Sequence, residues 1–164
     1  MNYEEYLSLV ERRFEKTCNF NIIKDIEERD IKIDLFANSI FVSCNLFKNK
    51  ITPFTKFEIY ENYYLKHFDY ISNKEVQEYF DFLRLIIDGE LPTYQHLQKC
   101  VIGIMICDSI GENCKNLIGS LNDIKPFSMY FKGWNEIQLI CVDLNIKKIY
   151  FNSAAQKNTE FFLF

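Results

Sequence analysis

The sequence predicts a single α+β domain over residues 1–164, with an antiparallel strand meander after an N-terminal helix, a helical middle and a β-α-β-β unit at the C-terminus. Three observations support this class. Hydrophobic spacing is helical at the N-terminus, alternation with a period of two follows it, and the last third contains the apolar run Cys100–Cys107. A chain of 164 residues is long enough to bury one sizeable core.

The first segment is expected to be an amphipathic helix. Apolar side chains recur at helical spacing on one face, namely Tyr3, Leu7, Val10 and Phe14, and charged side chains occupy the other face. Acidic residues in the first turn also suit the helix dipole.

Alternating apolar residues then predict the meander. Residues 20–26 and 31–35 form an expected antiparallel pair, and a turn at Asn38–Ser39 separates this pair from a third strand. Residues 57–68 alternate around Glu61–Asn62 as a hairpin would, although a helix also fits their pattern. The expected meander therefore has about five strands.

The middle of the chain is expected to be helical. Ser72 and Glu75 have the spacing of a capping box, apolar residues recur at helical intervals after them, and Gly89 ends the pattern. A short helical turn is expected over Tyr94–Lys99. The buried strand Cys100–Cys107 follows it directly.

The last third is expected to form the β-α-β-β unit. Ser109 and Glu112 repeat the capping-box spacing and predict a helix that lies on the sheet. Residues 127–131 and 134–144 predict two strands joined at Lys132–Gly133, where glycine can adopt turn conformations that other residues avoid. One shorter strand is expected after them.

The net charge and the hydropathy restrict the classes of partner. A formal net charge of −4 and a pI near 5.3 give no long-range attraction to phosphate backbones or anionic membranes. No apolar run approaches the roughly 20 residues of a membrane span, and the N-terminus lacks the pattern of a signal peptide. We therefore expect a cytoplasmic protein with no nucleic-acid partner and no membrane contact.

The six cysteines and two histidines form no metal or redox motif in the sequence. No Cys-x-x-Cys pair is present, and His67 and His96 stand apart from any paired ligand. Cys107 and Cys141 lie in apolar runs and are expected to be buried free thiols. His96 and Cys100 would meet only on a continuous helix, which the apolar run from Cys100 onward disfavours. The sequence thus predicts no metal site, no catalytic residue and no cofactor.

Carboxylates raise one enzymatic alternative, a metal-dependent hydrolase of the restriction-endonuclease type. Such enzymes place an Asp on one strand and a Glu-x-Lys on the next. Asp34 lies on an expected strand, but residues 41–46 after it contain neither a carboxylate nor a lysine. The active site of such a hydrolase would be degraded, and Asp108 is expected to be a turn residue beside the Ser109 cap. The carboxylates that an enzyme would bring together are Asp34, Glu58, Glu61 and Glu136.

The candidate interaction surface is the turn Lys132, Gly133 and Trp134, which holds the only tryptophan of the chain. Tryptophan is enriched at binding hot spots, although a turn tryptophan more often folds back over its own sheet. The terminal run Phe161–Phe164 would either dock on the core or cover a partner subunit. The expected partners are therefore a second copy of the chain, through this tail, or another protein.

The chain also resembles a known family over most of its length. The resemblance is carried by Val101–Ile106, Phe127–Trp134 and Leu139–Leu144, and Ile33–Ala37 and the N-terminal helix are similar too. The family consists of small uncharacterised proteins of low-GC bacteria with a domain of unknown function. The resemblance implies a stand-alone bacterial cytoplasmic domain and transfers no catalytic residue. We therefore expect a non-enzymatic binding or interaction domain, and the alternative is the diverged restriction-endonuclease-like hydrolase.

Overall fold

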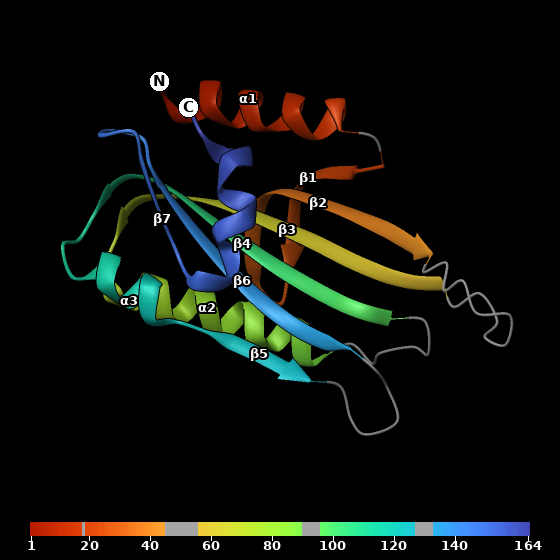
Figure 1. The fold of residues 1–164 in the computed structure, drawn as a ribbon. Helices are drawn as coiled ribbons and strands as arrows, with labels where there is room; N and C mark the ends of the chain where they lie inside the picture. The colour runs from red at the N-terminus through yellow and green to blue at the C-terminus, as the bar shows by residue number, and fades with distance from the viewer. Residues whose placement is uncertain (18, 45–55, 90–95, 127–132) are drawn as a thin grey trace, which may run out of the picture.

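A mixed sheet with helices on both faces makes up most of the computed structural model, which describes residues 1–17, 19–44, 56–89, 96–126 and 133–164 (Figure 1). In chain order, the elements are α1 (Tyr3–Lys16), β1 (Asn21–Glu28), β2 (Ile31–Cys44), β3 (Lys56–Ile71), α2 (Asn73–Asp88), β4 (His96–Ile110), α3 (Cys114–Ser120), β5 (Asp123–Pro126), β6 (Trp134–Asp143), β7 (Lys148–Phe151) and the 3₁₀ helix η1 (Ser153–Phe162).

The seven strands lie in the order β1-β2-β3-β4-β6-β5, and β7 also pairs with β6. The pairs β1–β2 and β2–β3 are antiparallel, whereas β4 is parallel to both β3 and β6. A parallel pair needs a crossover, which α2 provides between β3 and β4. β5 and β7 pair antiparallel with successive parts of β6. The α+β class is therefore confirmed.

The meander has three long strands where the sequence predicts about five. Asn38 and Ser39 do not turn the chain, because they pair with Asn62 and Glu61 inside the β2–β3 ladder. The two expected turns thus lie opposite each other, and strand pairing overrides the local turn preference of these polar residues. The expected hairpin between β1 and β2 is confirmed, and Arg29 at its turn has a positive φ of 50°.

The helical middle is only partly as expected. The Ser72–Glu75 capping box is present in α2, and Gly89 is its C-cap residue. The expected helical turn over Tyr94–Lys99 is wrong from residue 96 onward, because β4 begins there. Residues 94 and 95 lie outside the described residues. Strand positions four apart, such as His96 and Cys100, are separated by about 13 Å, which agrees with the expectation that the two residues do not form a histidine–thiol pair.

The C-terminal unit differs from the expected one at its helix. The predicted cap at Ser109 is wrong, because β4 continues to Ile110 and the Gly111 amide still donates to the Ile71 carbonyl at 2.9 Å. The short helix α3 begins only at Cys114, without a side-chain cap. The sequence also misses β5, while β6 and β7 lie where strands are expected. The predicted strand 127–131 lies outside the described residues.

Each face of the sheet carries one layer of the core. On one face, α2 packs so closely on β4 that a Cβ atom on Gly103 would lie 2.4 Å from Leu83 Cδ1. On the other face, α1 and η1 cover the sheet, and Phe162 of the C-terminal tail is fully buried. Cys107 and Cys141 are buried free thiols, as expected, with their sulfur atoms 3.9 Å apart. No described helix is long and apolar enough to cross a membrane.

Candidate functional site

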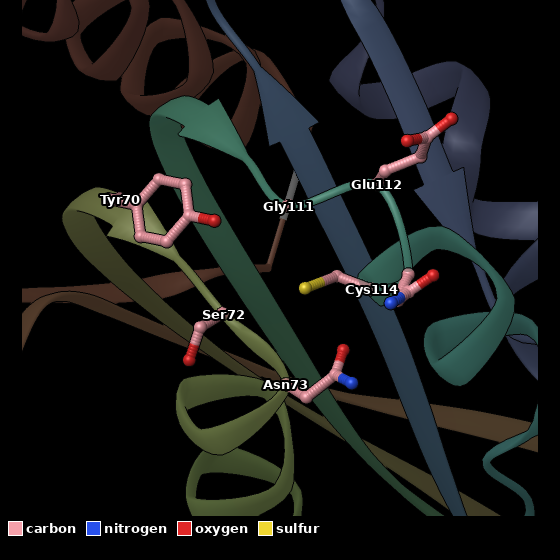
Figure 2. A pocket seen from close by; sticks show the side chains of 7 residues that line it. Tyr70, Ser72, Asn73, Gly111, Glu112 and Cys114 are labelled. Carbon is pink, nitrogen blue, oxygen red and sulfur yellow. The ribbon is translucent and has the colours of Figure 1, made fainter.

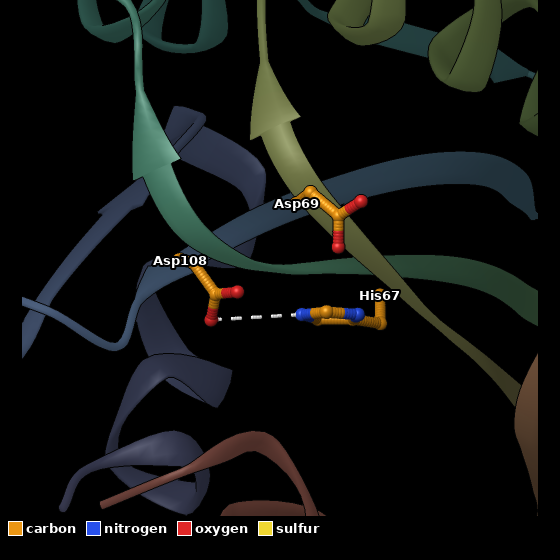
Figure 3. A group of neighbouring side chains, drawn as sticks. All are labelled: His67, Asp69 and Asp108. Carbon is orange, nitrogen blue, oxygen red and sulfur yellow. Dashed lines mark ion pairs between the residues drawn. The ribbon is translucent and has the colours of Figure 1, made fainter.

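Three metal-ligating side chains converge at the carboxyl ends of the parallel strands β3 and β4. His67 and Asp69 come from β3, and Asp108 comes from β4 (Figure 3). Phe68 pairs with Cys107, so Asp69 and Asp108 are neighbours across the strands. One ligand atom from each of the three side chains lies within 4.8 Å of the others, and no other described trio of His, Cys, Asp or Glu does so.

The imidazole of His67 has an unsatisfied nitrogen. Its Nε2 atom lies 3.7 Å from Asp108 Oδ1, which is too long for a hydrogen bond. Nε2 is buried and has no hydrogen-bond partner among the described residues. A buried polar atom without a partner costs about 1–3 kcal/mol, so its presence calls for an ion, a water or a ligand at this position.

Two further residues fix the position of His67. The Asp34 carboxylate accepts a hydrogen bond of 2.7 Å from the His67 main-chain amide, just beyond the last regular pair of the β2–β3 ladder, Leu35–Leu65. The Tyr3 ring stacks on the imidazole, with 4.2 Å between ring centroids. Burial and the nearby Asp34 carboxylate raise the pKa of Tyr3, so its hydroxyl stays protonated. His67 is therefore held both at its ring, by Tyr3, and at its main-chain amide, by Asp34.

The site is open to solvent on the carboxylate side. The Asp108 side chain is 61% exposed and that of His67 is 22% exposed. Ligand atoms around one Zn²⁺-sized ion lie about 3–3.5 Å apart, so rotation of the exposed carboxylates could close the present spacing. One imidazole and two carboxylates suit a divalent transition metal, and three protein ligands leave coordination positions free.

A separate pocket of about 360 Å³ opens near the same strand ends on the α2 and α3 side (Figure 2). It carries no activated group. The Cys114 thiol donates to the Ile71 carbonyl at 3.4 Å, and burial raises the pKa of this thiol. The Ser72 hydroxyl accepts the Lys74 amide as part of the helix cap. The residues that line the pocket are Tyr70, Ser72, Asn73, Gly111, Glu112, Asn113 and Cys114.

Two sequence expectations fail at the His67 site. Asp108 is a strand residue and not a turn residue, and His67 does not stand apart from other ligands. Both errors have one cause, because the three side chains come from two strands that only the parallel β3–β4 pairing brings together. The pattern His67-Phe68-Asp69, with ligand types two apart near the end of a strand, was the available signal.

The four carboxylates considered for a hydrolase do not form one cluster. Asp34 contacts His67, and Glu58 accepts a 2.6 Å hydrogen bond from Tyr60. Glu61 and Glu136 lie far along the sheet from Asp34, in register on either side of Cys100. In addition, the strand after that of Asp34 is β3, since residues 41–44 continue β2.

The candidate interaction surface is described only in part. Lys132 lies outside the described residues. Gly133 has a φ of 143°, a backbone conformation that favours glycine. Trp134 begins β6, pairs with Gln98 of β4 and remains 37% exposed.

Comparison with known proteins identifies a family but no activity. A family model described as a domain of unknown function (DUF8052) matches residues 2–164. No curated protein matches the chain, and no solved structure does.

Proposed function

The chain belongs to the DUF8052 family of unknown function, and from that premise we propose that it is a binding domain that holds one divalent transition-metal ion at His67, Asp69 and Asp108. The single observation that carries this proposal is the convergence of one imidazole and two carboxylates within 4.8 Å from two adjacent strands. Carboxylates alone gather often on protein surfaces, whereas the buried, unpartnered Nε2 of His67 adds a ligand that favours transition metals.

The support around the imidazole strengthens the proposal. Metal-binding histidines are normally held by a second layer of contacts that fixes the ring. Tyr3 and Asp34 provide such contacts, since one stacks on the ring and the other binds the backbone amide. The imidazole is thus positioned before an ion arrives, which lowers the cost of ordering this ligand.

The proposed role of the bound ion is to accept a ligand from another molecule. Because Asp69 and Asp108 are exposed, free coordination positions would face solvent. A protein partner, either a second copy or another chain, belongs to this proposal, as do a cytoplasmic location and an origin in low-GC bacteria. Four buried free cysteines support a reducing compartment.

A metal-dependent hydrolase is the second candidate, and one observation favours it. Asp34 of β2 contacts His67 of β3, so an acidic residue and a ligand pair lie on adjacent strands, much as the endonuclease pattern requires. β3 lacks the Glu-x-Lys of that pattern, and the Lys66 amine instead donates to the Lys32 carbonyl at 2.9 Å. A hydrolase would need a metal-bound water as the nucleophile.

Calorimetric titration of the full chain with Zn²⁺, and absorption spectra with Co²⁺, test the proposal. We expect one ion per chain, with binding at least tenfold weaker in Asp108→Asn and His67→Gln. Asp81→Asn, on the exposed side of α2, is the matched control and should bind like the unchanged chain. Absence of saturable binding, or equal affinity in Asp108→Asn, would refute the site.

Hydrolysis of an activated phosphodiester, bis(4-nitrophenyl) phosphate, separates the two candidates. Metal-dependent turnover that disappears in Asp108→Asn would establish the hydrolase. Tight metal binding without turnover would support the binding domain.

A further inference from the structure

A second set of polar residues crosses the sheet on the face under α1 and η1, at the end away from the His67 site. Ser39 of β2 pairs with Glu61 of β3, Glu61 pairs with Cys100 of β4, and Cys100 pairs with Glu136 of β6. Residues in register point to the same face, and Cys100 belongs to the core layer under α1 and η1. We call these four residues the Glu61–Glu136 row.

The two carboxylates of the row are separated by one strand. With neighbouring strands about 4.8 Å apart, the Cα atoms of Glu61 and Glu136 lie roughly 10 Å from each other. Each carboxylate accepts one neutral hydrogen bond, from the Tyr63 hydroxyl at 2.9 Å and from the Gln138 amide at 2.7 Å. Neither has an ion-pair partner among the described residues.

An independent observation at this row also indicates a ligand. Ser39 is only 2% exposed, and its hydroxyl has no hydrogen-bond partner among the described residues. Its register partner is Glu61, so the unsatisfied hydroxyl belongs to the strand position next to a carboxylate without a cation. A buried polar atom without a protein partner is rare unless a ligand or a water molecule forms a hydrogen bond with it.

The neighbouring row provides a border in which three of the four residues are apolar. Phe41, Ile59, Gln98 and Trp134 are in register next to the Glu61–Glu136 row, on the side away from η1. Phe41 and Trp134 are 38% and 37% exposed. The strands continue beyond the end of α1 at this side of the molecule (Figure 1). The border is therefore accessible to a molecule that carries both charge and apolar surface.

Metal binding and nucleophilic catalysis do not explain this row. Its carboxylate and thiol atoms do not converge as those of the His67 site do. Burial, together with Glu136 and Glu61, raises the pKa of Cys100, so the thiol remains protonated and unreactive. The chemistry that remains is electrostatic recognition of a cation.

We propose that the Glu61–Glu136 row binds a short aliphatic diammonium ion, with one ammonium group at each carboxylate and the alkyl chain along the exposed border of Phe41 and Trp134. Two charge-assisted hydrogen bonds of about 2.8 Å within a span of roughly 10 Å leave 4–5 Å between the ammonium groups. That spacing matches an extended chain of about three methylene groups. The roughly 10 Å span joins Cα atoms, so the freedom of the two Glu side chains also admits a fourth methylene group. The Ser39 hydroxyl then accepts from the ammonium group at Glu61.

Tryptophan fluorescence reports on this site alone, because Trp134 is the only tryptophan of the chain. Titration of the full chain with 1,4-diaminobutane should give a saturable change, and 1-aminobutane should bind at least tenfold more weakly. Glu61→Gln and Glu136→Gln each remove one charge while keeping the side-chain shape, and each should weaken diamine binding at least tenfold. Glu27→Gln, an exposed carboxylate on β1, is the matched charge control.

Equal binding of diamine and monoamine, or equal weakening by Glu27→Gln, would overturn the proposal, since either result indicates non-specific charge attraction. Glu136→Gln alone decides if Glu61→Gln fails to fold, because the two carboxylates lie on different strands, β6 and β3, and each variant tests the row by itself. The Asp108→Asn variant should bind the diamine normally. Failure of the metal proposal is thus distinguishable from failure of this one.

Discussion

The His67 main-chain amide donates a 2.7 Å hydrogen bond to the Asp34 carboxylate, just beyond Leu35–Leu65, the last regular pair of the β2–β3 ladder. The Asp34 side chain thus satisfies the backbone amide of His67, and the imidazole of His67 lies in the candidate metal site. Asp34 contributes to folding and to the geometry of His67 through one contact.

Replacing Asp34 should therefore affect both stability and metal binding. Asp34→Ala leaves the His67 amide without its acceptor and should lower the free energy of unfolding by about 1–3 kcal/mol. Because the imidazole is then less well positioned, Zn²⁺ affinity should fall about 10- to 100-fold. Denaturant unfolding and calorimetry measure the two effects.

The conservative variant Asp34→Asn keeps a carbonyl oxygen at the same place and should recover most of both losses. If Asp34→Ala binds Zn²⁺ as tightly as the unchanged chain, Asp34 has no positioning role.

The elements that the sequence predicts correctly are those whose signals are local. The α2 capping box and the Gly89 end lie within one helix, and both occur in the structure. The expected turns at Asn38 and Glu61 are wrong because the two segments pair with each other as strands β2 and β3. Local preference decides a strand boundary only where no partner strand competes.

The sequence does not predict the candidate site for a similar reason. His67 and Asp108 have no sequence relation, and parallel pairing through the α2 crossover makes them neighbours. The strand position of Asp34 marks it as a candidate in the sequence, but its partner has no sequence signal, because the contact is to a main-chain amide. A sequence pattern reveals which side chains are available, and the topology decides which of them meet.

The α2 cap makes part of the stability depend on pH. Hydrogen bonds from Ser72 lower the pKa of Glu75 from its usual 4.5. Since the folded-state pKa is the lower one, the stabilisation is present above the unfolded pKa and is lost as the pH falls through the folded pKa. We expect the free energy of unfolding to fall between about pH 5 and pH 3.

In Glu75→Gln this part of the fall should be absent, because glutamine keeps the capping geometry and does not titrate. Urea unfolding at several pH values measures the difference. Glu78→Gln, one turn later on α2 and outside the cap, is the control and should keep the dependence of the unchanged chain. Identical pH profiles of the unchanged chain and Glu75→Gln would show that the cap does not contribute.

The C-terminal tail packs on the helix that begins the chain. Phe162 is fully buried against the α1 side of the core, and its carbonyl accepts a hydrogen bond from the buried Tyr6 hydroxyl. Arg13 of α1 donates to the Phe161 carbonyl at 2.8 Å. The adjacent Leu163 is 51% exposed, so one tail residue belongs to the core and its neighbour does not.

Phe162→Ala should therefore lower the free energy of unfolding by about 3–5 kcal/mol, the usual cost of removing a buried phenylalanine ring. Leu163→Ala should change it by less than about 0.5 kcal/mol, since its side chain is largely in solvent. Removal of residues 159–164 should be at least as destabilising as Phe162→Ala, because it also removes the acceptors of Tyr6 and Arg13.

Denaturant unfolding, together with the mass in solution from light scattering, separates two roles of the tail. A loss of stability at constant mass identifies it as part of the chain's own core, whereas a lower mass in Leu163→Ala with unchanged stability would assign the exposed side of the tail to a partner subunit.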